Sequence, residues 1–275
     1  MQTRERSIDD MKYDTVKTDA FTMDYCRFGR GRDTLVILPG VSTQRVLTAG
    51  LAIAKAYAPL AEDYTIYLFE RRNDMPPGYS VREMARDTAR AIQALGLGPV
   101  NLFGASQGGM MAMVIAIEYP ALVGRLVLGS TSARISTARY QMFDRWIQLA
   151  KDGNAAELAL AFGQALYPPE VFEQSRSLLV ESARATTAEG LERFIIMAQA
   201  VKDFDILNDL GRIACPTLVI GSRADRVVGG DASVEIAGRI GNQPDCELFM
   251  YDGYGHAAYD LAPDYKARML RFLTA

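Results

Sequence analysis

The stretch from Val100 to Met110 constrains the fold of this chain more than any other part of it. Residues 100–103 are an apolar run that predicts a buried strand, and residues 110–118 predict a helix. Between them lies a G-x-S-x-G turn at 104–108, a pattern that holds a serine at a strained corner where the backbone passes too close for a Cβ. A glycine-rich turn of any parallel-sheet protein could share the five letters. The strand before the turn and the helix after it favour Ser106 as a nucleophile.

Short apolar runs alternate along the chain with segments of helical periodicity, which predicts a mostly parallel sheet covered by helices on both faces. An alternating segment at 12–28 predicts an antiparallel ribbon at the start, and Glu70–Gly78 predicts a polar loop. The predicted strands are 34–38, 64–69, 100–104, 125–129, 217–221 and 247–251, and the predicted helices are 50–60, 81–95, 110–118, 232–240 and 263–273.

Residues 136–210 contain no strand-like run and much helical periodicity. A stretch of this length between two strands is too long for an ordinary connection, so it is interpreted as an insertion. Its apolar residues at helical spacing are Tyr140, Met142, Phe143, Trp146, Leu149, Leu158, Phe162, Leu166, Phe194 and Met197.

Composition and charge exclude several classes of protein. A net charge of −3 without a run of lysines or arginines argues against nucleic-acid binding. No apolar stretch reaches the length of a membrane span, and residues 1–10 lack the apolar segment of a secretion signal. Three cysteines, Cys26, Cys215 and Cys246, lack metal-binding spacing and are interpreted as reduced, buried side chains of a cytoplasmic protein.

The chain has one histidine, His256, which excludes the zinc motifs that need two. No metal and no cofactor are therefore expected. A serine hydroxyl needs a base to take its proton, and that base needs a third group to orient it. Ser106, Asp225 and His256 each follow a predicted strand, and the carboxyl ends of parallel strands meet at one edge of a sheet. We predict that the three form a catalytic triad.

Two other acids could orient His256. Asp252 lies closer in sequence but in the histidine's own loop, and Asp231 lies near the start of the next predicted helix, where capping explains it. Asp225 is the preferred assignment. Taken separately, a loop histidine or a turn aspartate would need no catalytic explanation; the order of the three residues at three strand ends favours the triad.

Acyl transfer also needs donors for the oxyanion that forms on the substrate. The N–H of Gln107, directly after the nucleophile, is one candidate, and the N–H of Val41 in the loop after Leu38 is the other. Gly40 before Val41 is also explained by turn formation alone.

Taken together, these residues resemble the α/β-hydrolase-fold serine hydrolases with a helical cap, and the resemblance covers nearly the whole chain. Two positions depart from the family pattern: Pro39 stands where a histidine is common, and Glu70–Ser80 replaces the usual Asp-x-Arg-Gly-x-Gly-x-Ser loop. The segments that carry the resemblance are Leu38–Val41, Phe103–Gly109, Phe204–Leu207, Pro216–Asp225 and Gly253–His256.

The resemblance implies a hydrolase core at 1–133 and 213–275 and a helical cap at 134–212. A cap covers the active site, so some of its apolar residues are expected to line the substrate pocket, although for any one of them packing inside the cap is the simpler explanation. The candidates for the pocket are Phe143, Trp146, Phe162, Phe194 and Met197. An apolar roof favours small, largely uncharged acyl substrates.

The resulting hypothesis is a cofactor-free hydrolase of an ester or related acyl bond, with a small molecule as its partner. A homodimer is compatible with the sequence, and no membrane or nucleic-acid partner is expected. Two alternatives stay open. The same triad could cleave a C–C bond or transfer the acyl group, and the fold could serve as a non-catalytic receptor for a small molecule, because fold does not fix function.

Overall fold

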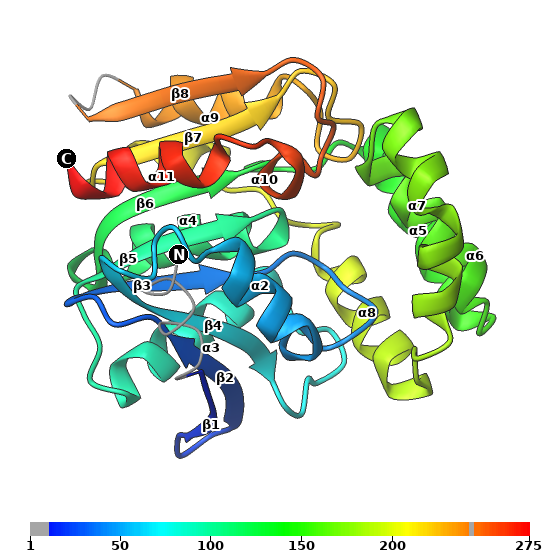
Figure 1. Ribbon diagram of the computed structural model, residues 1–275, viewed down its shortest axis with the longest axis horizontal. Helices are drawn as coiled ribbons and strands as arrows, with labels where there is room; N and C mark the ends of the chain where they lie inside the picture. The colour runs from blue at the N-terminus through cyan, green and yellow to red at the C-terminus, as the bar shows by residue number, and fades with distance from the viewer. Residues whose placement is uncertain (1–10, 242–244) are drawn as a thin grey trace.

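A central sheet forms the core of the computed structural model, which describes residues 11–241 and 245–275. In those residues the sheet has eight strands in the order β1-β2-β4-β3-β5-β6-β7-β8 (Figure 1). Strands β1 and β2 pair antiparallel with each other, β2 pairs antiparallel with β4, and the remaining neighbours are parallel. The strands are β1 Lys12–Lys17, β2 Thr22–Phe28, β3 Asp33–Leu38, β4 Tyr64–Arg72, β5 Val100–Ala105, β6 Val123–Gly129, β7 Thr217–Ser222 and β8 Cys246–Tyr251.

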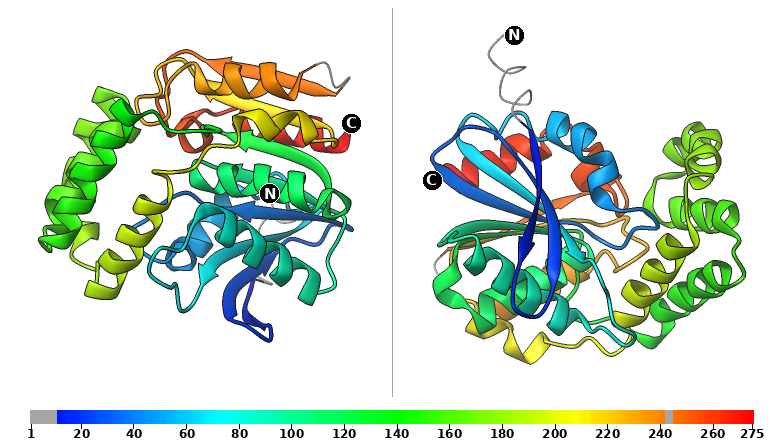
Figure 2. Two further views of the ribbon diagram at one scale, coloured as in Figure 1. Left: turned by 180° about the vertical axis from the view of Figure 1, so that it is seen from behind. Right: turned by 90° about the horizontal axis from the view of Figure 1, so that it is seen from below.

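Helices cover both faces of this sheet, as Figures 1 and 2 show from opposite sides. On one face, α3, α4 and α9 contribute to a hydrophobic cluster, and on the other α2, α10 and α11 contribute to a second cluster. The helices of the core are α2 Gly50–Ala56, α3 Val81–Ala94, α4 Gln107–Glu118, α9 Ala232–Ile240, α10 Ala258–Leu261 and α11 Tyr265–Thr274, with short 3₁₀ turns η1 Val46–Ala49, η2 Pro120–Leu122 and η3 Leu207–Arg212. The alpha/beta architecture predicted from the sequence is confirmed.

Four consecutive helices between β6 and β7 stand at the end of the sheet where the parallel strands finish, on the right in Figure 1. They are α5 Thr137–Lys151, α6 Ala155–Leu166, α7 Pro169–Ala183 and α8 Ala188–Ala200. This group, which we call the cap helices, falls inside the insertion expected at 134–212. The last residues of that range contact the core and not the cap helices alone, because η3 packs against α4 and α9.

Three local predictions were wrong in detail. The predicted loop at Glu70–Gly78 begins three residues later, because Glu70, Arg71 and Arg72 continue β4. The helix expected over 50–60 ends at Ala56, and the last helix begins at Tyr265 after the separate turn of α10. The predicted absence of a secretion signal concerns residues 1–10, which lie outside the described part of the chain.

Candidate active site

Ser106 occupies the corner between β5 and α4, and its backbone is strained there. Its φ of 54° lies in the left-handed region, which a residue with a side chain rarely adopts. Two hydrogen bonds hold the corner: the Ser106 N–H donates to the Gly129 carbonyl over 2.9 Å, and the Thr131 hydroxyl donates to the Ser106 carbonyl over 2.7 Å. The turn therefore fixes the serine at the carboxyl end of the sheet.

The glycines around Ser106 are required by close backbone contacts. A Cβ on Gly104 would lie 2.3 Å from the Gly108 carbonyl oxygen, and a Cβ on Gly108 would lie 2.0 Å from the Leu38 carbonyl oxygen. Both distances are far inside van der Waals contact. The G-x-S-x-G spacing thus lets α4 start directly above β3 and β5.

His256 joins Ser106 to Asp225 by two hydrogen bonds. Its Nε2 lies 3.0 Å from the Ser106 Oγ, and its Nδ1 lies 2.8 Å from Asp225 Oδ2. A carboxylate accepts from Nδ1–H, so Nε2 carries the lone pair that can take the serine proton. Ser106 follows β5, Asp225 follows β7 and His256 follows β8, so three strand ends bring the predicted residues together.

The second oxygen of Asp225 is held by the backbone, since Oδ1 accepts from the N–H groups of Val227 (2.8 Å) and Val228 (3.1 Å). Burial raises the pKa of this carboxyl, but the charge of His256, its hydrogen bond and the two amides outweigh burial, so that the pKa lies below the ordinary value. Asp225 therefore stays ionised beside the imidazole at neutral pH.

The two other candidate acids face solvent. The side chain of Asp252 is 90% exposed and pairs with Arg223, whereas that of Asp225 is 2% exposed. Asp231 is 86% exposed and pairs with Arg139, without capping the helix α9 that it precedes. Of the three acids, Asp225 is the one that contacts His256.

The two candidate oxyanion donors belong to segments that lie next to the nucleophile. Gln107 is the first residue of α4, so its N–H is at the amino end of that helix. Val41 belongs to the loop after β3, and its neighbour Gly40 is so close that an added Cβ would lie 2.9 Å from the Cβ of Ser106. Both Gly40 and Val41 line a cavity of about 500 Å³, which we call the oxyanion-loop cavity.

The sequence analysis missed Arg71, which links the two oxyanion segments. Its guanidinium donates to the Pro39 carbonyl (2.7 Å) and to the side-chain oxygen of Gln107 (3.2 Å). Gln107 in turn donates to the Met197 carbonyl of α8 over 2.7 Å, so the connection continues into the cap helices. Burial lowers the pKa of Arg71 to about 10, which leaves it charged at neutral pH. Its position in an apparent polar loop gave no signal of this role.

The candidate pocket residues in the cap helices pack largely against one another. Phe143, Trp146 and Phe194 are almost fully buried, and the ring of Trp146 lies 4.9 Å from the rings of both Phe143 and Phe162. These three aromatic residues therefore pack among the cap helices, which is the simpler of the two explanations offered for the apolar residues of the insertion. Met197 lies at a small cavity between α8 and the loop after β3.

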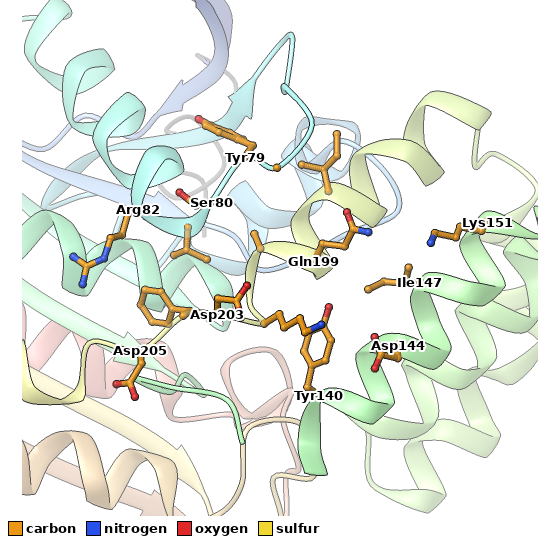
Figure 3. A pocket seen from close by; sticks show the side chains of 16 residues that line it. Tyr79, Ser80, Arg82, Tyr140, Asp144, Ile147, Lys151, Gln199, Asp203 and Asp205 are labelled. Carbon is orange, nitrogen blue, oxygen red and sulfur yellow. The ribbon is translucent and has the colours of Figure 1, made fainter. Parts of the chain in front are cut away.

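A third cavity, of about 460 Å³, lies between residues 78–82, where α3 begins, and helices α5 and α8 (Figure 3). Charged side chains of both signs surround it, and Ser106 and His256 do not line it. In residues 11–241 and 245–275, no group of potential ligands could hold a metal ion. No helix in the same residues is long and apolar enough to span a membrane.

The fold matches those of known proteins. The model of the alpha/beta hydrolase fold family covers residues 34–263, and the chain belongs to that family, a family of hydrolases. One relative of similar length is the protein named "Putative carbamate hydrolase RutD" of Rhizobium rhizogenes. The two sequences are 28% identical over 244 residues, which are 84% of this chain and 92% of that protein.

Two solved structures share the fold. One is MGS-M2, an alpha/beta hydrolase enzyme from a Medee basin deep-sea metagenome library, with a TM-score of 0.84, 21% identity, and coverage of 95% of this chain and 98% of that one. The other is the enol-lactonase from Burkholderia xenovorans LB400, with a TM-score of 0.82, 16% identity, and coverage of 95% and 100%.

Proposed function

We propose that this hydrolase cleaves an ester or related acyl bond of a small molecule through an acyl-enzyme, with Ser106, His256 and Asp225 as its catalytic residues. The observation that carries the proposal is the continuous hydrogen-bond chain from Asp225 through His256 to Ser106. The hydrogen-bond chain ends at Ser106. Gly40, which lies beside Ser106 in space, lines the oxyanion-loop cavity. The relatives' name fits the same chemistry, because a carbamate also presents an acyl carbon to a nucleophile.

The reaction has two steps. In the first, Ser106 Oγ attacks the acyl carbon while His256 Nε2 takes its proton, and the N–H groups of Val41 and Gln107 stabilise the oxyanion. The oxyanion collapses, and the leaving group departs with the proton from His256. In the second, His256 takes a proton from water, the resulting hydroxide attacks the acyl-enzyme, and Ser106 regains its proton as the acid is released. Asp225 keeps the Nδ1 proton throughout and stabilises the imidazolium.

The region around the site supports a small substrate. The oxyanion-loop cavity has a volume of about 500 Å³, within the usual range for small-molecule sites. Apolar side chains such as Ile37, Leu38 and Val46 form part of its wall. The cap helices stand at the same end of the sheet, and we propose that they form a cap over the site.

A fluorophosphonate probe tests the proposed nucleophile. We expect the probe to label Ser106 and no other serine, because Ser106 has the base within hydrogen-bond distance. Ser106→Ala should fold normally and lower the turnover of p-nitrophenyl esters by about four to six orders of magnitude. Peptide mapping and intact mass identify the labelled residue.

Ser177→Ala, a change of an exposed serine on α7, is the matched control and should label and turn over like the wild type. Labelling without turnover of any ester would favour a receptor. Label on another serine, or none on the folded protein, would contradict the proposed function.

A further inference from the structure

Part of the wall of the oxyanion-loop cavity is polar and aromatic. Tyr167, at the end of α6, and Tyr259 and Asp260, both in α10, line it together with Tyr57 after α2. Tyr259 also packs edge-on against the catalytic imidazole, with 6.2 Å between the ring centroids of His256 and Tyr259. This wall therefore lies close to His256, and it shares its cavity with Gly40 and Val41 of the proposed oxyanion loop.

Asp260 is the acidic residue among those that line the cavity. It is an exposed residue that lines the cavity wall, and among residues 11–241 and 245–275 its side chain takes part in no hydrogen bond or ion pair. Burial within the protein raises the pKa of Asp260, and the charges of Lys266 and His256 offset only part of that effect. The carboxylate is thus surrounded by protein but still reached by solvent, and no bonded cation among the described residues compensates its charge.

The cation nearest in sequence has other contacts. The buried ammonium of Lys266 donates to the Tyr259 carbonyl and lies 5.1 Å from the ring centroid of Tyr57 and 5.7 Å from that of Tyr265. It reduces the local field but forms no ion pair with Asp260 within 4.0 Å in the described residues. The side of Asp260 that faces the cavity is therefore available to a ligand.

We propose that Asp260 is a specificity-determining residue that binds a positively charged amino or ammonium group of the substrate, with the ring faces of Tyr167 and Tyr259 beside it. A carboxylate and aromatic rings around one cavity are the combination that recognises such cations, since the rings attract a cation through their quadrupoles. This inference rests on the proposed hydrolase function and narrows its substrates to acyl compounds that carry a cationic nitrogen. It also revises the expectation of uncharged substrates, which considered only the apolar residues of the insertion.

Pairs of substrates that differ in charge but not in shape test this proposal. The first pair puts the charge on the leaving group: the 2-(trimethylammonio)ethyl and 3,3-dimethylbutyl thioesters of acetate. The second puts it on the acyl group: the p-nitrophenyl esters of trimethylammonioacetate and 3,3-dimethylbutanoate. For at least one pair, Asp260→Asn should lower the ratio of kcat/KM for the cationic over the neutral substrate by roughly 10-fold or more. Intrinsic reactivity cancels, because ratios are compared between two enzymes.

Asp252→Asn is the matched control, because Asp252 is a solvent-exposed acid near His256 in sequence and should leave both ratios unchanged. Neutral substrates and the fluorophosphonate report separately on the triad. If Asp260→Asn leaves both ratios unchanged, or lowers turnover of cationic and neutral substrates equally, the role of Asp260 is wrong and the hydrolase function stands. If the wild type neither labels nor turns over any substrate, the hydrolase function itself fails.

Discussion

Arg71 joins two segments that the proposed oxyanion hole requires, through its hydrogen bonds to the Pro39 carbonyl and the Gln107 side chain. Arg71→Met should remove both hydrogen bonds, so that the Pro39 carbonyl and the Gln107 side-chain oxygen lose the guanidinium as a donor. We expect kcat for p-nitrophenyl esters to fall by roughly 10- to 100-fold with little change in KM, because displaced oxyanion donors act mainly on the transition state. Steady-state kinetics measure the split.

The control for Arg71 is Arg134→Met, which removes a half-exposed arginine paired with Glu235 and should leave kcat unchanged. Arg71→Lys keeps the charge and one donor group, so it should recover part of the loss. A full kcat in Arg71→Met, with only a lower melting temperature, would show that Arg71 stabilises the fold without positioning the donors.

The sequence predicted the three residues that the structure joins by hydrogen bonds, because each follows a strand whose end can be located from its apolar run. It could not settle Asp225 against Asp252 by spacing alone, since the choice depends on which carboxylate faces inward. Arg71 and Asp260 were invisible to motif analysis for the same reason: their importance comes from neighbours distant in sequence, such as Pro39 for Arg71.

At the scale of elements, β4 shows why charged residues mislead a prediction of strand ends. Glu70, Arg71 and Arg72 indicate a loop by composition, yet they extend the strand because each finds partners. Glu70 accepts from the Leu47 N–H over 2.9 Å, and Arg72 pairs with Asp87. Such partners come from other elements and could not be predicted from the local pattern. The helices with a clear apolar stripe, such as α3, were predicted almost to the residue.

The cap helices carry the chain's single tryptophan, Trp146, which is 1% exposed. It belongs to the same hydrophobic cluster as the α4 face of the sheet. We therefore expect the cap helices and the core to unfold together: in a urea titration, tryptophan fluorescence and far-UV circular dichroism should give coincident transitions. A fluorescence transition at lower urea than the circular dichroism transition would show that the cap helices unfold independently.

Trp146→Ala provides the matching energetic test of the same packing. It should lower the free energy of unfolding by about 3–5 kcal/mol through the lost contacts and the cavity left behind. Because Trp146 packs against Phe143 and Phe162, away from the triad contacts, the folded variant should still label with the fluorophosphonate.

At the scale of the whole molecule, the parallel sheet is what turns three distant segments into one site. Strands β5, β7 and β8 end at the same edge, and the cap helices stand over that edge (Figure 1). The alternation of strands and helices predicted this arrangement. The periodicity within the insertion could not show which apolar side chains face the site, because it identifies a buried stripe and not the neighbour that covers it.

The rate at which the fluorophosphonate labels Ser106 in three variants tests the central claim, the triad, most directly. His256→Ala should abolish labelling, since the chain has no second histidine to act as base. Asp225→Asn should slow labelling by about three to four orders of magnitude without unfolding the protein, because it sets the wrong tautomer of His256. Asp252→Asn should label like the wild type. Normal labelling in His256→Ala, or a loss in Asp252→Asn with none in Asp225→Asn, would contradict the account.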